Sequence, residues 1–217
     1  MLKFNCIKKT EEDLPSELEN SIFSLTHVVV GNTNFTLLPV SEADNAQSFK
    51  LNFLSEDSLN FSLYEDIKIV YNVPAAATSL SKQLVNAALD SDATLALAHF
   101  TKKEHSNAIY FYEADNILTI VAVKKGVLHL ANRYNVDSLD ELFYYIMLVV
   151  EQLELSPDSL HVECISTAGV HEEYTKLFKN YLPSIKLTAL QHSVNNGDNL
   201  EHKDAQQLAA FFSQCVL

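Results

Sequence analysis

Apolar and polar residues are spaced for short strands and amphipathic helices along the whole chain, and the pattern changes near residue 105. In the first part, the apolar runs 27–30 and 35–38 flank the turn-forming residues 31–34, a pattern that predicts a β-hairpin. The other elements predicted before residue 105 are strands at 2–6 and 67–71 and helices at 14–24, 42–52, 75–89 and 92–103.

The second part opens with three strand-like runs joined by short turn-forming segments, which predicts a three-stranded meander. A helix from Ser138 follows, with Ser138 and Glu141 at capping-box spacing and the strongest helical periodicity in the chain. The predicted strands are 108–112, 117–123, 127–130, 160–165 and 185–190, and the predicted helices are 138–153, 172–182 and 203–215.

The order of these elements predicts the fold class. A meander whose third strand leads through a helix to further strands is the ribonuclease H-like half-unit, the building block of actin-like ATPases. Residues 1–104 show a comparable but incomplete order. We therefore expect an α/β protein built as a tandem of βββαβα units, with a degenerate first subdomain at 1–104, truncated at its N-terminus, and a second subdomain at 105–217. A generic α/β sandwich is the alternative architecture.

Charge and composition narrow the function classes. The 217 residues include 28 Asp and Glu against 15 Lys and Arg, a net charge of -13 that argues against a nucleic-acid partner. The four glycines are far apart, so no glycine-rich phosphate loop is present. Three distant cysteines and the absence of a signal peptide or a membrane-spanning run predict a cytoplasmic protein without membrane insertion.

Three segments carry a resemblance to a known family: residues 28–39 (VVVGNTNFTLLP), 117–132 (ILTIVAVKKGVLHLAN) and 137–156 (DSLDELFYYIMLVVEQLELS). They resemble an uncharacterised, mainly Bacteroidetes protein family with an actin-like ATPase fold. In fold, this family is similar to the cytoplasmic actin-like domains of pilus-assembly and secretion systems, which act by holding partners. The resemblance implies a fold, with no established activity behind it.

The resemblance also implies where a nucleotide cleft would lie. Family members usually have a β-hairpin before the segment equivalent to residues 2–7, and no such hairpin precedes that segment in this sequence, so we expect the first phosphate loop to be missing. The second loop corresponds to residues 113–119, which contain no glycine and two carboxylates that would repel a phosphate. The residues of this degenerate cleft are Glu113, Asp115, Asn116, Thr119, Ser166, Thr167 and Gly169.

Alternative interpretations remain open for these residues. Glu113 and Asp115 are carboxylates of the type that binds a divalent metal, or they belong to a solvated turn, which we favour. The segment 166–169 either binds adenosine phosphates or caps a helix, and we favour the cap. A catalytic Cys164 is rejected, because strand alternation turns it away from His161 and Glu163.

We therefore expect a non-catalytic actin-like domain that binds an unidentified protein partner, and a homodimer is a candidate assembly. We expect it to have no catalytic residue, metal site or cofactor. The alternative is a nucleotide-binding ATPase or a metal-dependent phosphoryl hydrolase that uses ATP and Mg²⁺ at the same residues.

Overall fold

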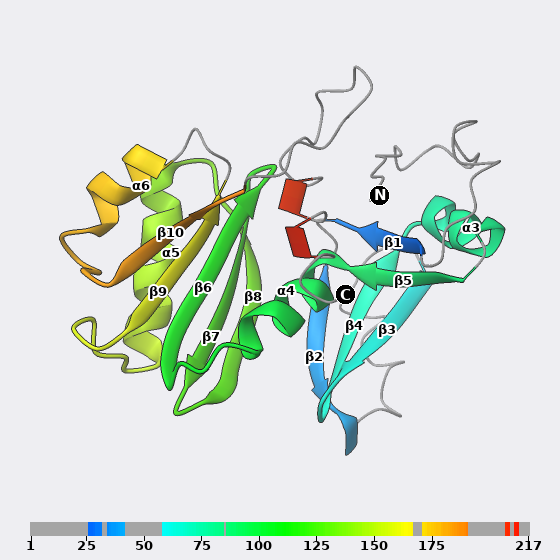
Figure 1. Ribbon diagram of the computed structural model, residues 1–217, viewed down its shortest axis with the longest axis horizontal. Coiled ribbons are helices and arrows are strands. Elements are labelled where there is room, and N and C mark those ends of the chain that lie inside the picture. The colour runs from blue at the N-terminus through cyan, green and yellow to red at the C-terminus, as the bar shows by residue number, and fades with distance from the viewer. Residues whose placement is uncertain are drawn as a thin grey trace.

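The computed structural model describes residues 26–31, 34–41, 58–84, 86–166, 171–190, 207–208 and 211–212. These residues form three β-sheets, two before and one after helix α4 (Asp92–Thr101). Figure 1 shows α4 between the sheet that contains β6–β10 and the strands of the first part of the chain. The predicted strand 2–6 and the predicted helices 14–24 and 42–52 lie outside the described residues.

The first part of the chain holds a two-stranded and a three-stranded sheet. Strand β1 (Thr26–Val30) pairs in parallel with β5 (Ala87–Ser91). Strands β2 (Phe35–Pro39), β4 (Ile67–Val73) and β3 (Ser58–Tyr64) pair antiparallel in the order β2-β4-β3. The predicted hairpin of 27–30 with 35–38 is therefore wrong, because both strands form but each pairs with a strand that is distant in sequence.

The predicted helix 75–89 is too long. Helix α3 covers Ala75–Gln83 and ends at Leu84, whose backbone is extended (φ -90°, ψ 135°). The chain then enters β5, a strand that the sequence pattern assigned to the helix because it is rich in alanine and leucine. Pairing with β1 overrides this local preference.

The second part of the chain forms one five-stranded sheet in the order β10-β9-β6-β7-β8. Strands β6, β7 and β8 are consecutive antiparallel neighbours, and β9 lies beside β6 and parallel to it. This arrangement confirms the predicted meander and the predicted place of the fourth strand. The bounds are β6 Asn107–Ala114, β7 Ile117–Lys124, β8 Val127–Asn135, β9 His161–Ser166 and β10 Ile185–Ala189.

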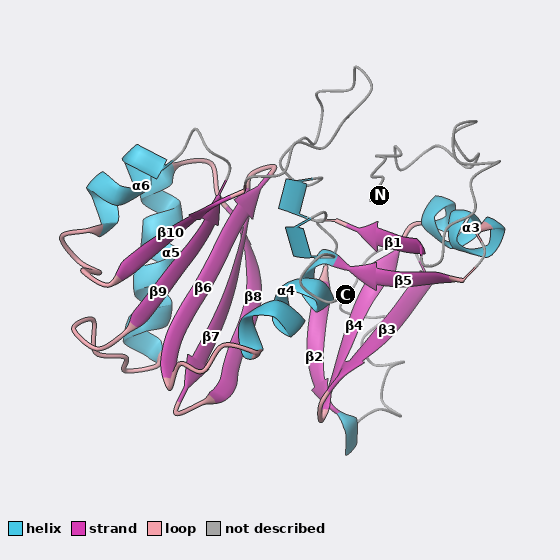
Figure 2. Ribbon diagram, viewed as in Figure 1, coloured by secondary structure: helices cyan, strands magenta, loops and turns pink. Residues whose placement is uncertain are grey.

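Helix α5 (Leu139–Gln152) begins where the capping residues predict. The Ser138 side chain accepts a hydrogen bond from the Glu141 amide (3.2 Å), and the Glu141 carboxylate accepts one from the Asp137 amide (2.8 Å). Its buried face, with Leu142, Ile146 and Val149, packs on the five-stranded sheet together with α6 (His171–Phe178). Figure 2 shows both helices on the same side of this sheet.

The opposite face of the five-stranded sheet packs on the first part of the chain. One buried apolar cluster contains Tyr110, Tyr112 and Val121 of the sheet together with Phe100 of α4 and Tyr71 of β4. The two parts of the chain thus share one core. The division at 104/105 stays a prediction. Within the described residues, no helix has the length and apolar character needed to cross a membrane.

Candidate functional site

The predicted second phosphate loop is the turn between β6 and β7. Ala114 pairs with Ile117, so only Asp115 and Asn116 form the loop, and both have positive φ angles (53° and 62°). This is a two-residue turn of the type I′ class, whose twist matches that of antiparallel strands. The connection is shorter than the predicted four residues, because Glu113 and Ala114 belong to β6.

The Glu113 carboxylate makes two hydrogen bonds beside this turn. Its Oε1 accepts a hydrogen bond from the Asn116 amide at 3.2 Å, and its Oε2 accepts one from the Tyr174 hydroxyl at 3.5 Å. Burial raises the pKa of Tyr174, and nearby Cys164 and Glu113 raise it further. The turn amide is thus hydrogen-bonded to a carboxylate of its own hairpin.

Ser166 lies at the same end of the sheet as this turn. Strands β6 and β9 are parallel, and their pairing ends with Tyr112 beside Ile165, so the residues that follow, Glu113 and Ser166, lie at the same end of the two strands. Ser166 is buried, and its carbonyl accepts a hydrogen bond from the Leu190 amide at 3.0 Å. The structure therefore brings four of the predicted site residues to one sheet edge: Glu113, Asp115, Asn116 and Ser166. Thr167 and Gly169 lie outside the described residues.

Thr119 belongs to a different set of contacts. It stands between Tyr112 of β6 and Arg133 of β8 in the sheet register, and its hydroxyl accepts a hydrogen bond from Arg133 Nε at 3.1 Å. Arg133 Nη2 lies 2.5 Å from Asp92 Oδ1, and the Tyr112 hydroxyl donates to Asp92 Oδ2 at 3.4 Å. The Phe35 ring of β2 lies 5.2 Å from the guanidinium carbon.

The electrostatics of this buried set are balanced by the ion pair. Burial alone would lower the pKa of Arg133, but the charge of Asp92 and the hydrogen bond to it raise the pKa, so the guanidinium stays charged. Burial, together with Asp92, raises the pKa of Tyr112, which stays a neutral donor. Sequence reasoning missed this set, although Arg133 is the only arginine in the chain.

The residues His161, Glu163 and Cys164 are arranged as strand alternation predicts. His161 and Glu163 share one face of β9, with His161 Nε2 at 3.7 Å from Glu163 Oε2. Cys164 is buried in the cluster under α5 and α6, and burial raises the pKa of its thiol. The predicted alternation is confirmed, since Cys164 lies on the other face of β9 from His161 and Glu163. No group of three or more potential metal ligands occurs in the part of the chain that the structure describes.

Solved structures share this architecture. A crystal structure from Bacteroides thetaiotaomicron VPI-5482, a protein with an actin-like ATPase fold and unknown function, aligns with a TM-score of 0.73 and 16% identity, covering 91% of this chain and 77% of that one. The PilM–PilN type IV pilus biogenesis complex aligns with a TM-score of 0.53 and 10% identity, covering 90% and 81%. The chain has an actin-like ATPase fold, as the element order predicts.

The sequence comparison gives the family. Residues 13–185 match the family described as protein of unknown function (DUF3822), and the chain belongs to that family. Comparison with curated proteins gives no significant match. The resemblance inferred from the three sequence segments is confirmed.

Proposed function

We propose that this chain is a non-catalytic actin-like domain that acts as a protein-binding or scaffolding module and whose nucleotide cleft is degenerate. One observation carries the proposal: the Asn116 amide at the β6–β7 turn donates its hydrogen bond to the Glu113 carboxylate. A nucleotide phosphate at this turn would have to displace a negative group that is tied to the same hairpin. It would also approach two carboxylates, those of Glu113 and Asp115, at close range.

The backbone of the turn adds to the argument. A loop that surrounds a phosphate needs several amides that converge on the anion, usually supplied by glycines. The β6–β7 loop has only two residues, Asp115 and Asn116, and neither is glycine. Such a turn offers few amides to a ligand, which favours a role without phosphate chemistry.

The protein-binding part of the proposal is supported by a structural neighbour. PilM has the same fold and is observed in a complex with PilN. A domain of this fold can therefore serve as a binding partner in an assembly, and we propose the same class of role for this chain. Its partner is an unidentified protein, and a second copy of the chain is a further candidate.

One observation favours the alternative function. Glu113, Asp115 and Ser166 lie at the same end of the five-stranded sheet. A magnesium ion bound there would screen the carboxylates from a phosphate. This arrangement is compatible with a nucleotide-binding ATPase or a metal-dependent phosphoryl hydrolase. Any assay for nucleotide binding must therefore contain magnesium.

Isothermal titration calorimetry of the full chain with Mg-ATP separates the two functions. We expect no saturable binding with a dissociation constant below about 100 μM, which corresponds to roughly -5.5 kcal/mol. Tighter binding would contradict the proposal. In that case Glu113→Ala, compared with the exposed control Glu104→Ala, shows whether the nucleotide lies at the β6–β7 turn. A change in affinity for Glu113→Ala alone would place it there.

The partner requires a second measurement. Chemical crosslinking in native cells, followed by mass spectrometry, should join this chain to one protein through crosslinks confined to one face. Sedimentation of the purified chain separates a homodimer from a complex with another protein. A monomer without any crosslinked partner would contradict the scaffolding role.

A further inference from the structure

A polar cluster that the proposed function does not use lies where α4 ends beside the strands β6, β9 and β10. Its centre is Glu163, which is 2% exposed. In the sheet register, Glu163 stands between Tyr110 of β6 and Lys186 of β10. We call this cluster the Glu163 corner; its members are Lys103, His105, Tyr110, His161, Glu163, Lys186 and Thr188.

The Glu163 carboxylate is held by two short hydrogen bonds. Lys103 Nζ donates to Oε2 at 2.7 Å, and the Thr188 hydroxyl donates to Oε1 at 2.7 Å. Burial alone would raise the pKa of Glu163, but these two hydrogen bonds and the nearby lysine charges lower it. The carboxylate is therefore ionised, and Lys103 is its main counter-charge.

Two buried polar atoms in the corner make no hydrogen bond to the described residues. The Tyr110 side chain is fully buried, and its hydroxyl makes no hydrogen bond. His161 Nε2 lies 3.7 Å from Glu163 Oε2, a separation too long for a hydrogen bond, and it makes no other. Buried polar groups are rarely left in this state, since each costs about 1–3 kcal/mol.

The corner has more donors and more positive charge than one carboxylate can satisfy. Lys186 Nζ lies 3.9 Å from Glu163 Oε1, and its side chain is 64% exposed. His105 stacks on His161 with ring centroids 3.7 Å apart, which adds a second imidazole. Lysines are donors only, and a tyrosine hydroxyl donates one hydrogen bond. Glu163 is the only carboxylate in this group of seven residues, in a chain whose net charge is -13.

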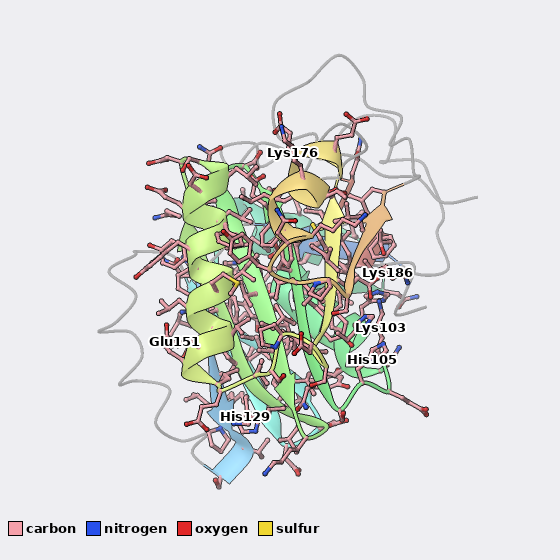
Figure 3. The ribbon with its side chains drawn as sticks, turned by 90° about the vertical axis from the view of Figure 1, so that its left-hand side faces the viewer. Lys103, His105, His129, Glu151, Lys176 and Lys186 are labelled. Atoms are coloured by element: carbon pink, nitrogen blue, oxygen red, sulfur yellow. The ribbon has the colours of Figure 1, made fainter. Side chains whose placement is uncertain are left out.

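Three members of the corner are labelled in the side view. Figure 3 shows Lys103, His105 and Lys186 gathered along one edge of the molecule, beside β10, whereas Glu151 lies on α5 at the opposite edge. The side chains of Lys103 and His161 are each 24% exposed, so solvent reaches the corner from this edge. A ligand would approach the corner from this edge.

We propose that the Glu163 corner binds an anionic group with several oxygen atoms, either a phosphate or a carboxylate. Lys186, His161 and Tyr110 donate to the oxygens of the anion. Lys103 shares its charge between the anion and Glu163, and Thr188 keeps Glu163 turned away from the ligand. This site is separate from the nucleotide cleft, and it does not depend on the proposed function.

The test is a calorimetric titration of the full chain with inorganic phosphate and, separately, with citrate, against sodium chloride at equal ionic strength. We expect saturable binding of at least one of the two oxyanions and none of chloride. Tighter binding of phosphate assigns the site to phosphate groups, and tighter binding of citrate assigns it to carboxylates. A response to both that chloride reproduces is charge screening and would overturn the proposal.

Three variants locate the binding. Lys186→Met should weaken it about tenfold or more, since a charge-assisted hydrogen bond is lost. Lys176→Met removes the same charge from the exposed surface of α6 and should leave the affinity unchanged. Tyr110→Phe should weaken binding without loss of stability, because the hydroxyl has no partner in the unliganded protein. Equal anion affinities of the two lysine variants would contradict the proposal. A Tyr110→Phe protein that is destabilised but binds the anion with unchanged affinity would also contradict it.

Discussion

Asp92, in the first turn of α4, and Arg133, on β8, form a buried ion pair with 2.5 Å between Oδ1 and Nη2. The two side chains are 7% and 9% exposed. The pair joins the five-stranded sheet to helix α4. Because each charge is removed from water, each depends on the other for compensation.

Arg133→Met should therefore destabilise the protein by about 3–5 kcal/mol, because it leaves the Asp92 carboxylate buried without its counter-charge. The double variant Asp92→Leu with Arg133→Met should be more stable than Arg133→Met alone, since it buries no unpaired charge. Urea denaturation of the three proteins measures the difference.

The exposed ion pair of Lys124 and Glu154 provides the control for this experiment. Their charged atoms are 3.9 Å apart and the Glu154 side chain is 88% exposed, so Lys124→Met should cost less than about 1 kcal/mol. A cost for Arg133→Met no larger than this control would mean that the Asp92 carboxylate is solvated.

The packing of α5 gives a second prediction. Ile146 is fully buried in the cluster between α5 and the five-stranded sheet. Ile146→Ala should cost on the order of 2–5 kcal/mol, as truncations of buried aliphatic side chains do. Chemical denaturation measures the loss, and Tyr144→Ala on the exposed side of the same helix is the control. A loss below about 1 kcal/mol would contradict the position of the core.

The backbone of the β6–β7 turn gives a third prediction. Asn116 has a φ of 62°, a conformation that glycine adopts without steric cost. Asn116→Gly should keep or increase stability by up to about 1 kcal/mol, whereas Asn116→Ala should lower it. Gly126 of the β7–β8 turn, with a φ of 76° and open space around it, is the matched site: Gly126→Ala should also destabilise. Thermal unfolding of the variants tests this order of stabilities. A stabilising effect of Asn116→Ala would contradict the prediction.

The second part of the chain was predictable because its contacts are local. Strands β6, β7 and β8 are joined by two-residue turns, and α5 begins at a serine with a glutamate three residues later. Both signals lie within a short stretch of sequence. The order of the strands then followed from the handedness and continuity of the chain.

For the first part of the chain, the prediction failed where a strand pairs with another strand that is distant in the sequence. Strand β1 pairs with β5 across β2, β3, β4 and α3, and no local pattern encodes that partner. The candidate sites show the same limit. Alternation predicted that His161 and Glu163 share a face, but Lys103 reaches Glu163 from the end of α4, and Arg133 meets Asp92 only through the tertiary fold. The sequence identifies candidate residues of this kind, but the tertiary fold determines which of them come into contact.

The last prediction concerns His99 of α4, whose ring lies against Phe100, Phe211 and Phe212 at centroid distances of 5.3, 5.2 and 5.9 Å. Burial, and after it the charge of Lys103, lowers the pKa of His99 from 6.5 to about 4, against the opposing effect of Glu163. The folded protein thus binds this proton less readily than the unfolded chain does. The stability that neutral His99 contributes is complete above pH 6.5 and is lost as the pH falls from 6.5 toward 4.

His99→Leu should lose less stability than the wild type between pH 7 and pH 4.5 in urea denaturation, whereas His129→Leu, at an exposed position of β8, should follow the wild type. If the His99→Leu and wild-type curves are parallel over this range, the imidazole is solvated and its pKa is not lowered by the aromatic cluster.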